Sequence, residues 1–240
     1  MQPQMKISIS ATNPCHLYPL AIELARREAL GAYYSGYPAW KLRDKERLNV
    51  RTHSLRTTIV YGLLKLPERF RPAPKSLFRW QDHGFDRWTG AHLANADFVH
   101  AMPGQALHTF RGAKRLGIRT VLNHATGPVR TWVKIMEPEY QRVCLKLTDV
   151  CPYDEAYFAR EDEEYALADW HCAASSVVRQ QLIDLGIDSR RIWQVPYGAD
   201  ERVFHSNGRS APKDFRIVFA GQLGVRKGLP TMLELSLIHI

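Results

Sequence analysis

The 240-residue sequence is poor in cysteine and contains no long apolar run. Its four cysteines form no C-x-x-C pair and stand in no Cys/His grouping with metal-site spacing: Cys15, Cys144, Cys151 and Cys172. We therefore expect free thiols in a reducing cytoplasm and no metal site. The longest apolar stretches, such as residues 59–66, fall far short of the roughly 20 residues that a membrane span needs. The first residues contain no apolar core of secretory length, so export is not expected.

Acidic residues are fewer than basic ones, and the net charge of +9 is unevenly distributed. Between Lys41 and Arg87 there are twelve Lys or Arg residues and five Asp or Glu residues. Aromatic residues interleave with these cations: Phe70, Phe78, Trp80, Phe85 and Trp88. Cations beside apolar anchors suit an anionic membrane surface or a phosphorylated acceptor, and they also suit nucleic acid. The alternative is a solvated helical surface over ordinary core aromatics.

Segments with strand and helix patterns alternate along the chain, with short connections and no internal repeat. Strands are expected at 6–10, 31–35, 96–100, 118–122, 170–174 and 192–195. Helices are expected at 18–30, 53–66, 76–94, 105–116, 137–147, 154–168 and 176–185, with the acidic residues 154–164 forming a plain exposed helix. This alternation predicts an α/β fold with a doubly wound, Rossmann-like parallel sheet, in which ligands bind at the carboxyl ends of the strands.

A glycine-rich turn with two adjacent cations follows the apolar residues Phe215–Ala220, which we expect to form a strand. Gly221 ends this run, Arg226 and Lys227 follow, and Gly228 opens a helix. Glycine lets the backbone approach a ligand closely, and both the cations and a helix N-terminus favour an anion. The pattern therefore predicts a phosphate-binding turn.

Residues 165–234 resemble glycosyltransferase family 4, whose members have the two-domain GT-B fold. The resemblance rests on the order and spacing of several short segments: Ala168-Asp169-Trp170, Ala174-Ser175-Ser176, Leu185-Gly186-Ile187, Ile192–Gly198, Asp200 with Phe204, and Ile217–Gly228. They cover about a third of the chain. The resemblance implies an N-terminal acceptor-side Rossmann-like domain (residues 1–197), a linker (198–213) and the incomplete start of a second Rossmann-like domain that binds nucleotide-sugar (214–234).

Members of this family transfer a sugar from a nucleotide-sugar to an acceptor and retain the anomeric configuration. The resemblance therefore implies a nucleotide-sugar co-substrate, no bound cofactor or metal, and a glycan or lipid-linked acceptor, as in polysaccharide biosynthesis. The free thiols and the basic, aromatic-rich segment lead us to expect a protein of the cytoplasm or of the inner face of an anionic membrane, and we expect no nucleic-acid partner. Because a nucleoside diphosphate departs, fixed cations would stabilise the transition state more than the ground state.

The resemblance also assigns residues to the donor diphosphate. Lys227 matches the diphosphate-contacting lysine of the family, and Arg226 lies beside it. Gly221 would allow close approach of the backbone, whereas Gln222 stands where the family often has arginine. One of the two usual cations is thus missing, and either Arg226 compensates for it or the donor binds more weakly.

On the first domain, His124 matches a family histidine near the reacting sugar, where a neutral imidazole would act in catalysis by contacting a sugar hydroxyl or positioning the acceptor. A structural loop histidine is the alternative. Asn13 and His16 lie in the loop that contacts the acceptor in the family, although this loop lacks the paired glycines often found there.

The last six residues, Leu235–Ile240, break the expected helix at 230–234. The codons CTG TCT CTT ATA CAC ATC encode this hexapeptide and resemble the end of a transposase library adapter, which predicts a non-native tail. A natural C-terminus is the alternative. We expect the parent protein to be longer and the 240-residue chain to be inactive, because the acidic pair of the family lies downstream of residue 234. Sugar transfer by the purified chain would contradict this expectation. Two other hypotheses stay open: a GT-B-fold nucleotide-sugar epimerase or phosphorylase, and a non-catalytic protein that binds membrane or nucleic acid.

Overall fold

The computed structural model describes residues 5–43, 45–94, 96–147, 151, 153–201, 203–205, 208 and 217–238. The chain divides into two compact units. The first unit comprises Met1–Pro128 and Pro152–Val195, and the second comprises Val129–Cys151 and Pro196–Ile240. The domain boundaries that the sequence predicts, including a linker at 198–213, stay a prediction.

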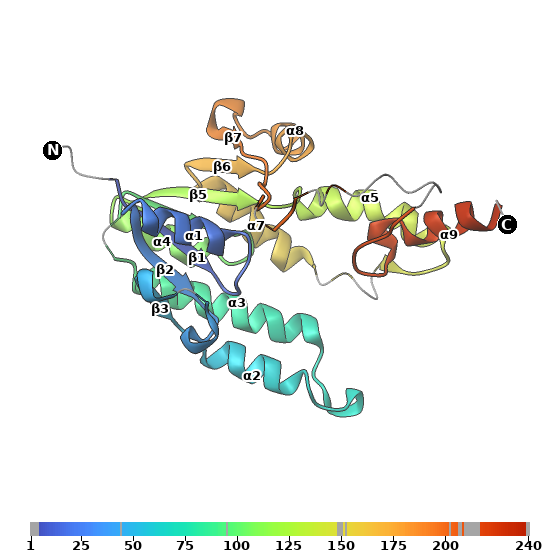
Figure 1. Cartoon of the computed structure of the whole chain (residues 1–240), viewed down its shortest axis with the longest axis horizontal. Coiled ribbons are helices and arrows are strands. Elements are labelled where there is room, and N and C mark those ends of the chain that lie inside the picture. Colours follow the sequence, from blue (N-terminus) through green and yellow to red (C-terminus); the bar gives the residue numbers. More distant parts are fainter. Residues whose placement is uncertain are drawn as a thin grey trace. The chain divides into compact units, whose positions relative to one another are not determined.

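The first unit is built on a seven-stranded parallel sheet (Figure 1). Its strands are β1 (Ile7–Ala11), β2 (Leu30–Ser35), β3 (Val50–Thr52), β4 (Phe98–Ala101), β5 (Arg119–His124), β6 (Trp170–Ala173) and β7 (Ile192–Gln194). They are arranged in the order β3-β2-β1-β4-β5-β6-β7, and every neighbouring pair is parallel. The direction of winding therefore changes between β1 and β4, which makes their carboxyl ends the topological switch point.

Helices pack on both faces of this sheet. They are α1 (Leu17–Arg26), α2 (Leu55–Leu63), α3 (Pro74–Ala91), α4 (Leu107–Arg115), α7 (Glu155–Leu167) and α8 (Ser176–Asp184). On one face, α1 buries Leu17 and Ala21 against Ile9 and Tyr33. On the other, Phe110 of α4 and Leu182 of α8 pack with Val99 and Leu122, while Phe85 of α3 packs with Tyr34. Parallel sheets need cover on both faces, and this arrangement confirms the predicted α/β Rossmann-like class.

Several local expectations are wrong. The short edge strand β3 was not predicted, because Val50-Arg51-Thr52 is too brief to show an alternating pattern. Residues 217–220 form no strand, whereas 215 and 216 lie outside the described residues, so the expected opening strand of a second Rossmann-like domain is not found in the part that the structure describes. Ile217 and Val218 are 76% and 84% exposed.

The second unit contains α5 (Val129–Arg142), a 3-10 turn (Val225–Lys227) and α9 (Leu229–Ile238). The helix expected at 137–147 thus begins eight residues earlier, at Val129. Within this unit, Arg142 binds both carboxylate oxygens of Glu234, at 2.8 and 2.9 Å, and the Thr231 hydroxyl at 3.0 Å. The expected helix break at Leu235 is wrong, because α9 continues through Ile238. Leu, Ile and Ser are all compatible with a helix.

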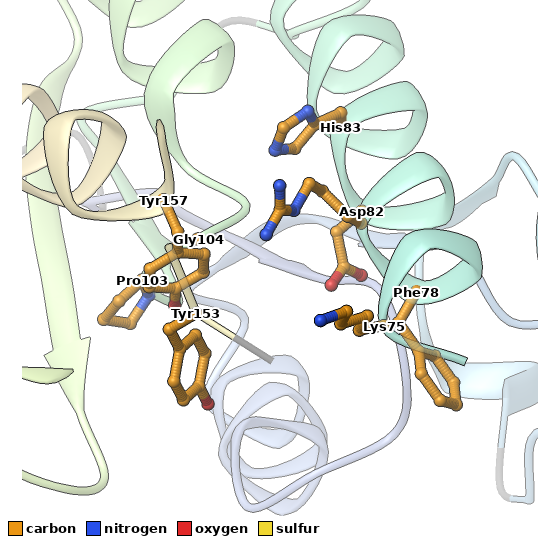
Figure 2. A pocket seen from close by; sticks show the side chains of 9 residues that line it. Lys75, Phe78, Asp82, His83, Pro103, Gly104, Tyr153 and Tyr157 are labelled. Atoms are coloured by element: carbon orange, nitrogen blue, oxygen red, sulfur yellow. The ribbon is translucent and has the colours of Figure 1, made fainter. Parts of the chain in front are cut away.

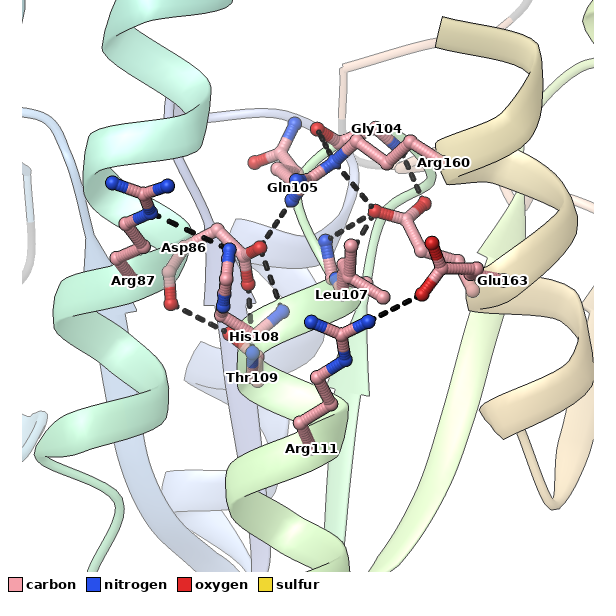
Figure 3. A network of polar contacts seen from close by, with 12 residues as sticks. Asp86, Arg87, Gly104, Gln105, Leu107, His108, Thr109, Arg111, Arg160 and Glu163 are labelled. Carbon is pink, nitrogen blue, oxygen red and sulfur yellow. Dashed lines mark hydrogen bonds and ion pairs between the residues drawn. The ribbon is translucent and has the colours of Figure 1, made fainter. Parts of the chain in front are cut away.

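A buried polar network holds the N-terminus of α4 (Figure 3). Asp86 of α3 accepts the backbone N–H groups of His108 and Thr109, both at 2.8 Å. Glu164 of α7 accepts three more, from Gly104 at 2.6 Å, Ala106 at 3.0 Å and Leu107 at 3.1 Å. These two carboxylates therefore satisfy the donors that the first turn of a helix leaves unpaired.

Arg160 joins the two carboxylates. Its guanidinium contacts Asp86, lies 3.2 Å from Glu164 Oε1 and donates to the Gly104 carbonyl at 3.1 Å. Arg160 and Glu164 are 8% and 0% exposed, so α7 is not the plain exposed helix that its acidic sequence predicts. Its charged residues divide between solvent and a buried face that caps another helix.

We expect Glu164→Gln to lower the free energy of unfolding by about 3 kcal/mol, because it removes a buried charge from Arg160 and directs an amide N–H₂ towards backbone donors. Burial raises the pKa of Glu164 to about 7, against the lowering influence of Arg160. The stabilities of the wild type and the variant are therefore compared by urea denaturation at pH 8, where Glu164 is ionised. The matched control is Glu163→Gln, because the exposed Glu163 pairs with Arg111 at the surface. This change should cost less than about 1 kcal/mol. Equal losses in the two variants would contradict the structural role of Glu164.

Candidate functional site

The loops that follow β1 and β4 meet at the switch point of the first unit. The backbone N–H and the hydroxyl of Thr12 both donate to Gln105 Oε1, at 2.6 and 2.7 Å. Gly104 precedes Gln105 with a φ of 81°, and a Cβ there would lie 2.8 Å from the Tyr157 hydroxyl. Glycine is therefore required at this position, both for the backbone conformation and for the close approach of α7.

Asp82 of α3 reaches the same point and forms a hydrogen bond with Thr12. Burial raises the pKa of Asp82 to about 6, assisted by the nearby Asp86 and opposed by the Thr12 hydrogen bond and the charge of Arg160. The Thr12 hydroxyl has one proton, which Gln105 Oε1 accepts. A protonated Asp82 would extend this series of hydrogen bonds by donating its proton to the Thr12 hydroxyl oxygen. Asp82 is thus a carboxyl group that changes charge close to neutral pH.

A cavity of about 280 Å³ opens beside Asp82, and we call it the first cavity (Figure 2). The side chains that line it include Lys75, Phe78, Arg79, Asp82, Tyr153 and Tyr157. Figure 2 shows residues from α3 and from the segment leading into α7 on opposite walls. The Tyr153 and Tyr157 ring centroids are 4.6 Å apart, and Arg79 pairs with Asp154 at 2.8 Å. The volume is near the lower limit of small-molecule sites, roughly 300 Å³.

Sequence reasoning predicted no cavity here, and it named Phe78 only as one aromatic residue of the basic segment. Lys75, Arg79 and Asp82 are spaced so that they share one face of α3, and such a charged face is usually solvated. The chemistry of Asp82 depends on Thr12 and Arg160, which are distant in sequence, and on Asp86, one turn further along α3. Nothing in the local pattern of α3 separates Asp82 from an ordinary surface carboxylate.

The structure places both predicted acceptor-side residues at the switch point, although their role stays a prediction. His16 Nε2 lies 2.8 Å from Asn123 Oδ1, and Asn123 Nδ2 lies 3.1 Å from His100 Nε2. This arrangement makes His16 the donor to the amide oxygen and His100 the acceptor from its N–H₂ group. Burial and the neighbouring His16 lower the pKa of His100 to about 4. Asn13 Oδ1 accepts from the Tyr61 hydroxyl at 3.4 Å.

His124, the predicted catalytic residue, ends β5 but points into the core. It is 1% exposed, its Nε2 lies 2.9 Å from His171 Nδ1, and its ring packs edge-on against Tyr165. Burial lowers the pKa of His124 well below its ordinary value, with His171 and His100 adding to the effect. In this structure the imidazole is enclosed, and its catalytic role stays a prediction. Asn123, the preceding residue, points to the opposite face and joins His16.

The four residues assigned to the donor diphosphate lie in one exposed turn of the second unit. Gly221 has a φ of 156°, and Gly228 is in the left-handed region at 72°. The stem of Lys227 lies against Gly221, with its Cδ 3.9 Å from where a Cβ of Gly221 would be. Gln222 and Arg226 are exposed beside them. The turn therefore brings Gly221 and Lys227 together, as a phosphate-binding turn requires, and its function stays a prediction.

Solved structures that resemble the chain include enzymes of nucleotide-sugars. Anabaena HepE, in complex with UDP and glucose, matches with a TM-score of 0.49 and 11% identity, over 85% of this chain and 47% of that protein. A putative UDP-N-acetylglucosamine 2-epimerase from Listeria monocytogenes has a TM-score of 0.43 and 11% identity, over 79% of this chain and 44% of that protein. The lipopolysaccharide outer core galactosyltransferase WaaB has a TM-score of 0.38 and 11% identity, over 79% of this chain and 44% of that protein.

The chain thus spans about half the length of these structures. No protein-family model and no curated protein matches the sequence. Because the TM-scores are below 0.5, these similarities carry no argument about function, and membership of glycosyltransferase family 4 stays a prediction. In the described residues no helix is long and apolar enough to cross a membrane. Nor does that part of the chain contain a group of three or more His, Cys, Asp or Glu side chains that could hold a metal ion.

We expect acid to destabilise the first unit through the buried His124–His171 pair. Burial, with a contribution from Arg191, lowers the pKa of His171 to about 4, whereas an unfolded histidine titrates near 6.5. The unfolded chain therefore binds more protons between these values. The free energy of unfolding should be unaffected by this histidine above pH 6.5. It should fall at lower pH, by up to about 1.4 kcal/mol per pH unit for each such histidine.

Urea denaturation between pH 8 and pH 4.5 measures this dependence. His171→Asn should make the fall between pH 6.5 and 4.5 shallower, because it removes one titrating group. The matched control is His205→Asn, which changes an exposed histidine of the second unit and should leave the slope unchanged. Identical slopes for the wild type and His171→Asn would show that the buried pair does not titrate as we expect.

Proposed function

We propose that the whole protein is a glycosyltransferase that transfers a sugar from a nucleotide-sugar to an acceptor. In this proposal the exposed turn at residues 221–228 binds the departing diphosphate, and the switch-point site of the first unit faces the acceptor. The observation that carries the proposal is the packing of the Lys227 stem against Gly221, in a turn that opens directly into α9. Glycine, cation and helix start together are a recurrent way of binding phosphate groups.

The chemistry requires a site for negative charge that grows during the reaction. As the sugar leaves, charge accumulates on the diphosphate, and a fixed cation stabilises this charge more in the transition state than in the bound donor. Lys227 supplies such a cation, and Arg226 supplies a second one beside it. Arg226 takes the place of the cation that is missing at Gln222. The ordered His16–Asn123–His100 chain and Asp82 supply polar groups for acceptor hydroxyls at the switch point.

The test uses the product of the complete gene with a panel of labelled nucleotide-sugars. We expect Lys227→Ala to lower kcat/KM for transfer by about 100-fold, the order found when one charge-stabilising group is removed from an active site. The matched control is Lys134→Ala, which removes an exposed lysine from α5 and should leave transfer unchanged. Unchanged transfer by Lys227→Ala would contradict the proposal. Epimerised nucleotide-sugar without release of nucleoside diphosphate would identify an epimerase instead.

We further propose that the segment between Lys41 and Arg87 meets an anionic membrane. Phe70 and Trp80 are 64% and 42% exposed, and each has an arginine over its ring, Arg69 at 4.7 Å and Arg56 at 4.6 Å. Such pairs join an apolar anchor to a cation, as in proteins that bind membrane surfaces. Phe85, by contrast, is an ordinary core aromatic residue, because it is 1% exposed and packs against Trp88.

Co-sedimentation with vesicles tests this contact. We expect binding to vesicles containing phosphatidylserine, weakened by salt, and a loss of about tenfold in Phe70→Ser/Trp80→Ser because the apolar anchors are removed. The control is Trp193→Ser, a comparably exposed tryptophan on β7. Equal binding to uncharged vesicles, or an unaltered double variant, would refute the contact.

A further inference from the structure

A second cavity of the first unit, of about 440 Å³, adjoins the loop that carries the switch-point site. The polar side chains that line it are Asn13, Tyr18, Tyr37, Lys41, Arg43 and Tyr61. Asn13 directly follows Thr12, the residue bound to Gln105 and Asp82. The second cavity therefore includes Asn13, one of the two predicted acceptor-side residues.

The charge of the second cavity is positive. Lys41 and Arg43 are both exposed, and no carboxylate is among the described residues that line the cavity. Within the described part of the chain, neither cation takes part in an ion pair. Arg79 and Arg160, by contrast, form ion pairs with Asp154 and Asp86. Two uncommitted cations in one cavity favour an anionic ligand.

The walls of the second cavity are held in place by hydrogen bonds and ring contacts. The Tyr18 hydroxyl of α1 donates to the Arg43 carbonyl, and the Tyr61 hydroxyl of α2 donates to Asn13. Lys41 Nζ lies 5.9 Å from the centroid of the Tyr37 ring. Burial, with Tyr37 and Asp82 adding to the effect, raises the pKa of Tyr61 and keeps its hydroxyl protonated. The cavity thus presents aromatic rings and neutral hydroxyl groups beside its two cations.

We propose that the second cavity binds a phosphate group attached to the acceptor, with Lys41 and Arg43 contacting the phosphate and the tyrosine rings contacting the adjoining sugar. This inference rests on the proposed function and names the class of its acceptor, a phosphorylated carbohydrate. The planar guanidinium of Arg43 can bind two phosphate oxygens together, and Lys41 adds a point charge. Tyrosine supplies an apolar ring face together with a polar edge, which suits a sugar ring.

The test measures binding of glucose 1-phosphate and of glucose to the 240-residue chain by isothermal titration calorimetry. We expect glucose 1-phosphate to bind and glucose to bind at least tenfold more weakly, because the latter lacks the charge. The double variant Lys41→Gln/Arg43→Gln should weaken binding of glucose 1-phosphate by about 100-fold, since two charge-assisted contacts are lost. The matched control, Arg26→Gln/Arg27→Gln, removes two exposed arginines that pair with Glu23 on α1, and it should bind as the wild type does.

Lys41→Arg keeps the charge and should retain binding, which separates loss of the contact from loss of the fold. Equal affinity for glucose and glucose 1-phosphate, or unaltered binding by the double variant, would overturn the proposal. Vesicles containing phosphatidic acid distinguish two sources of the phosphate. Displacement of glucose 1-phosphate supports a lipid-borne acceptor, and its retention supports a free sugar phosphate. Failure of the proposed function shows separately, as unchanged transfer by Lys227→Ala. The present test depends instead on the change in binding caused by Lys41→Gln/Arg43→Gln, which leaves the turn at residues 221–228 intact.

Discussion

The Asp86–Arg160–Glu164 network is the constraint on which the arrangement of the first unit depends. Asp86 comes from α3, Arg160 and Glu164 come from α7, and all three converge on the N-terminus of α4. They hold the loop after β4 through both the N–H and the carbonyl of Gly104. Because Gln105 follows at once and binds Thr12, this network also sets the geometry of the switch point.

The same network decides where an anion can bind. The N-terminus of α4 lies at the carboxyl end of the sheet, where parallel α/β proteins often bind phosphate. Here its backbone N–H groups already donate to two carboxylates of the chain itself. Negative charge from a ligand would be repelled at that point. Side-chain cations are what the first unit offers an anion instead, and Lys41 and Arg43 are two cations of one cavity that take part in no ion pair among the described residues.

The histidines that surround β5 form two groups, one on each face of the strand. Asn123 and His124 are consecutive, so their side chains point to opposite faces of the sheet. Asn123 meets His16 and His100 at the switch point, whereas His124 meets His171 and Tyr165 in the core. A shift of one position along β5 therefore decides whether a polar side chain lies at the candidate site, as Asn123 does, or is enclosed in the core, as His124 is. Burial nevertheless lowers the pKa of a histidine on each face: His100 at the switch point and His171 in the core, each to about 4.

The sequence by itself determined the class of fold and most of the element order, because a period of two in strands and 3.6 in helices follows directly from burial of one face. It also determined that Gly221 and Lys227 belong to one turn, since both lie within a few residues. Only the tertiary structure decided the charge states and partners at the switch point. Asp82, Arg160 and Glu164 resemble surface charges in sequence. Arg160 and Glu164 become buried, and Asp82 half-buried, because three helices meet around the start of α4. Burial and long-range pairing set their chemistry, and neither property is encoded in local periodicity.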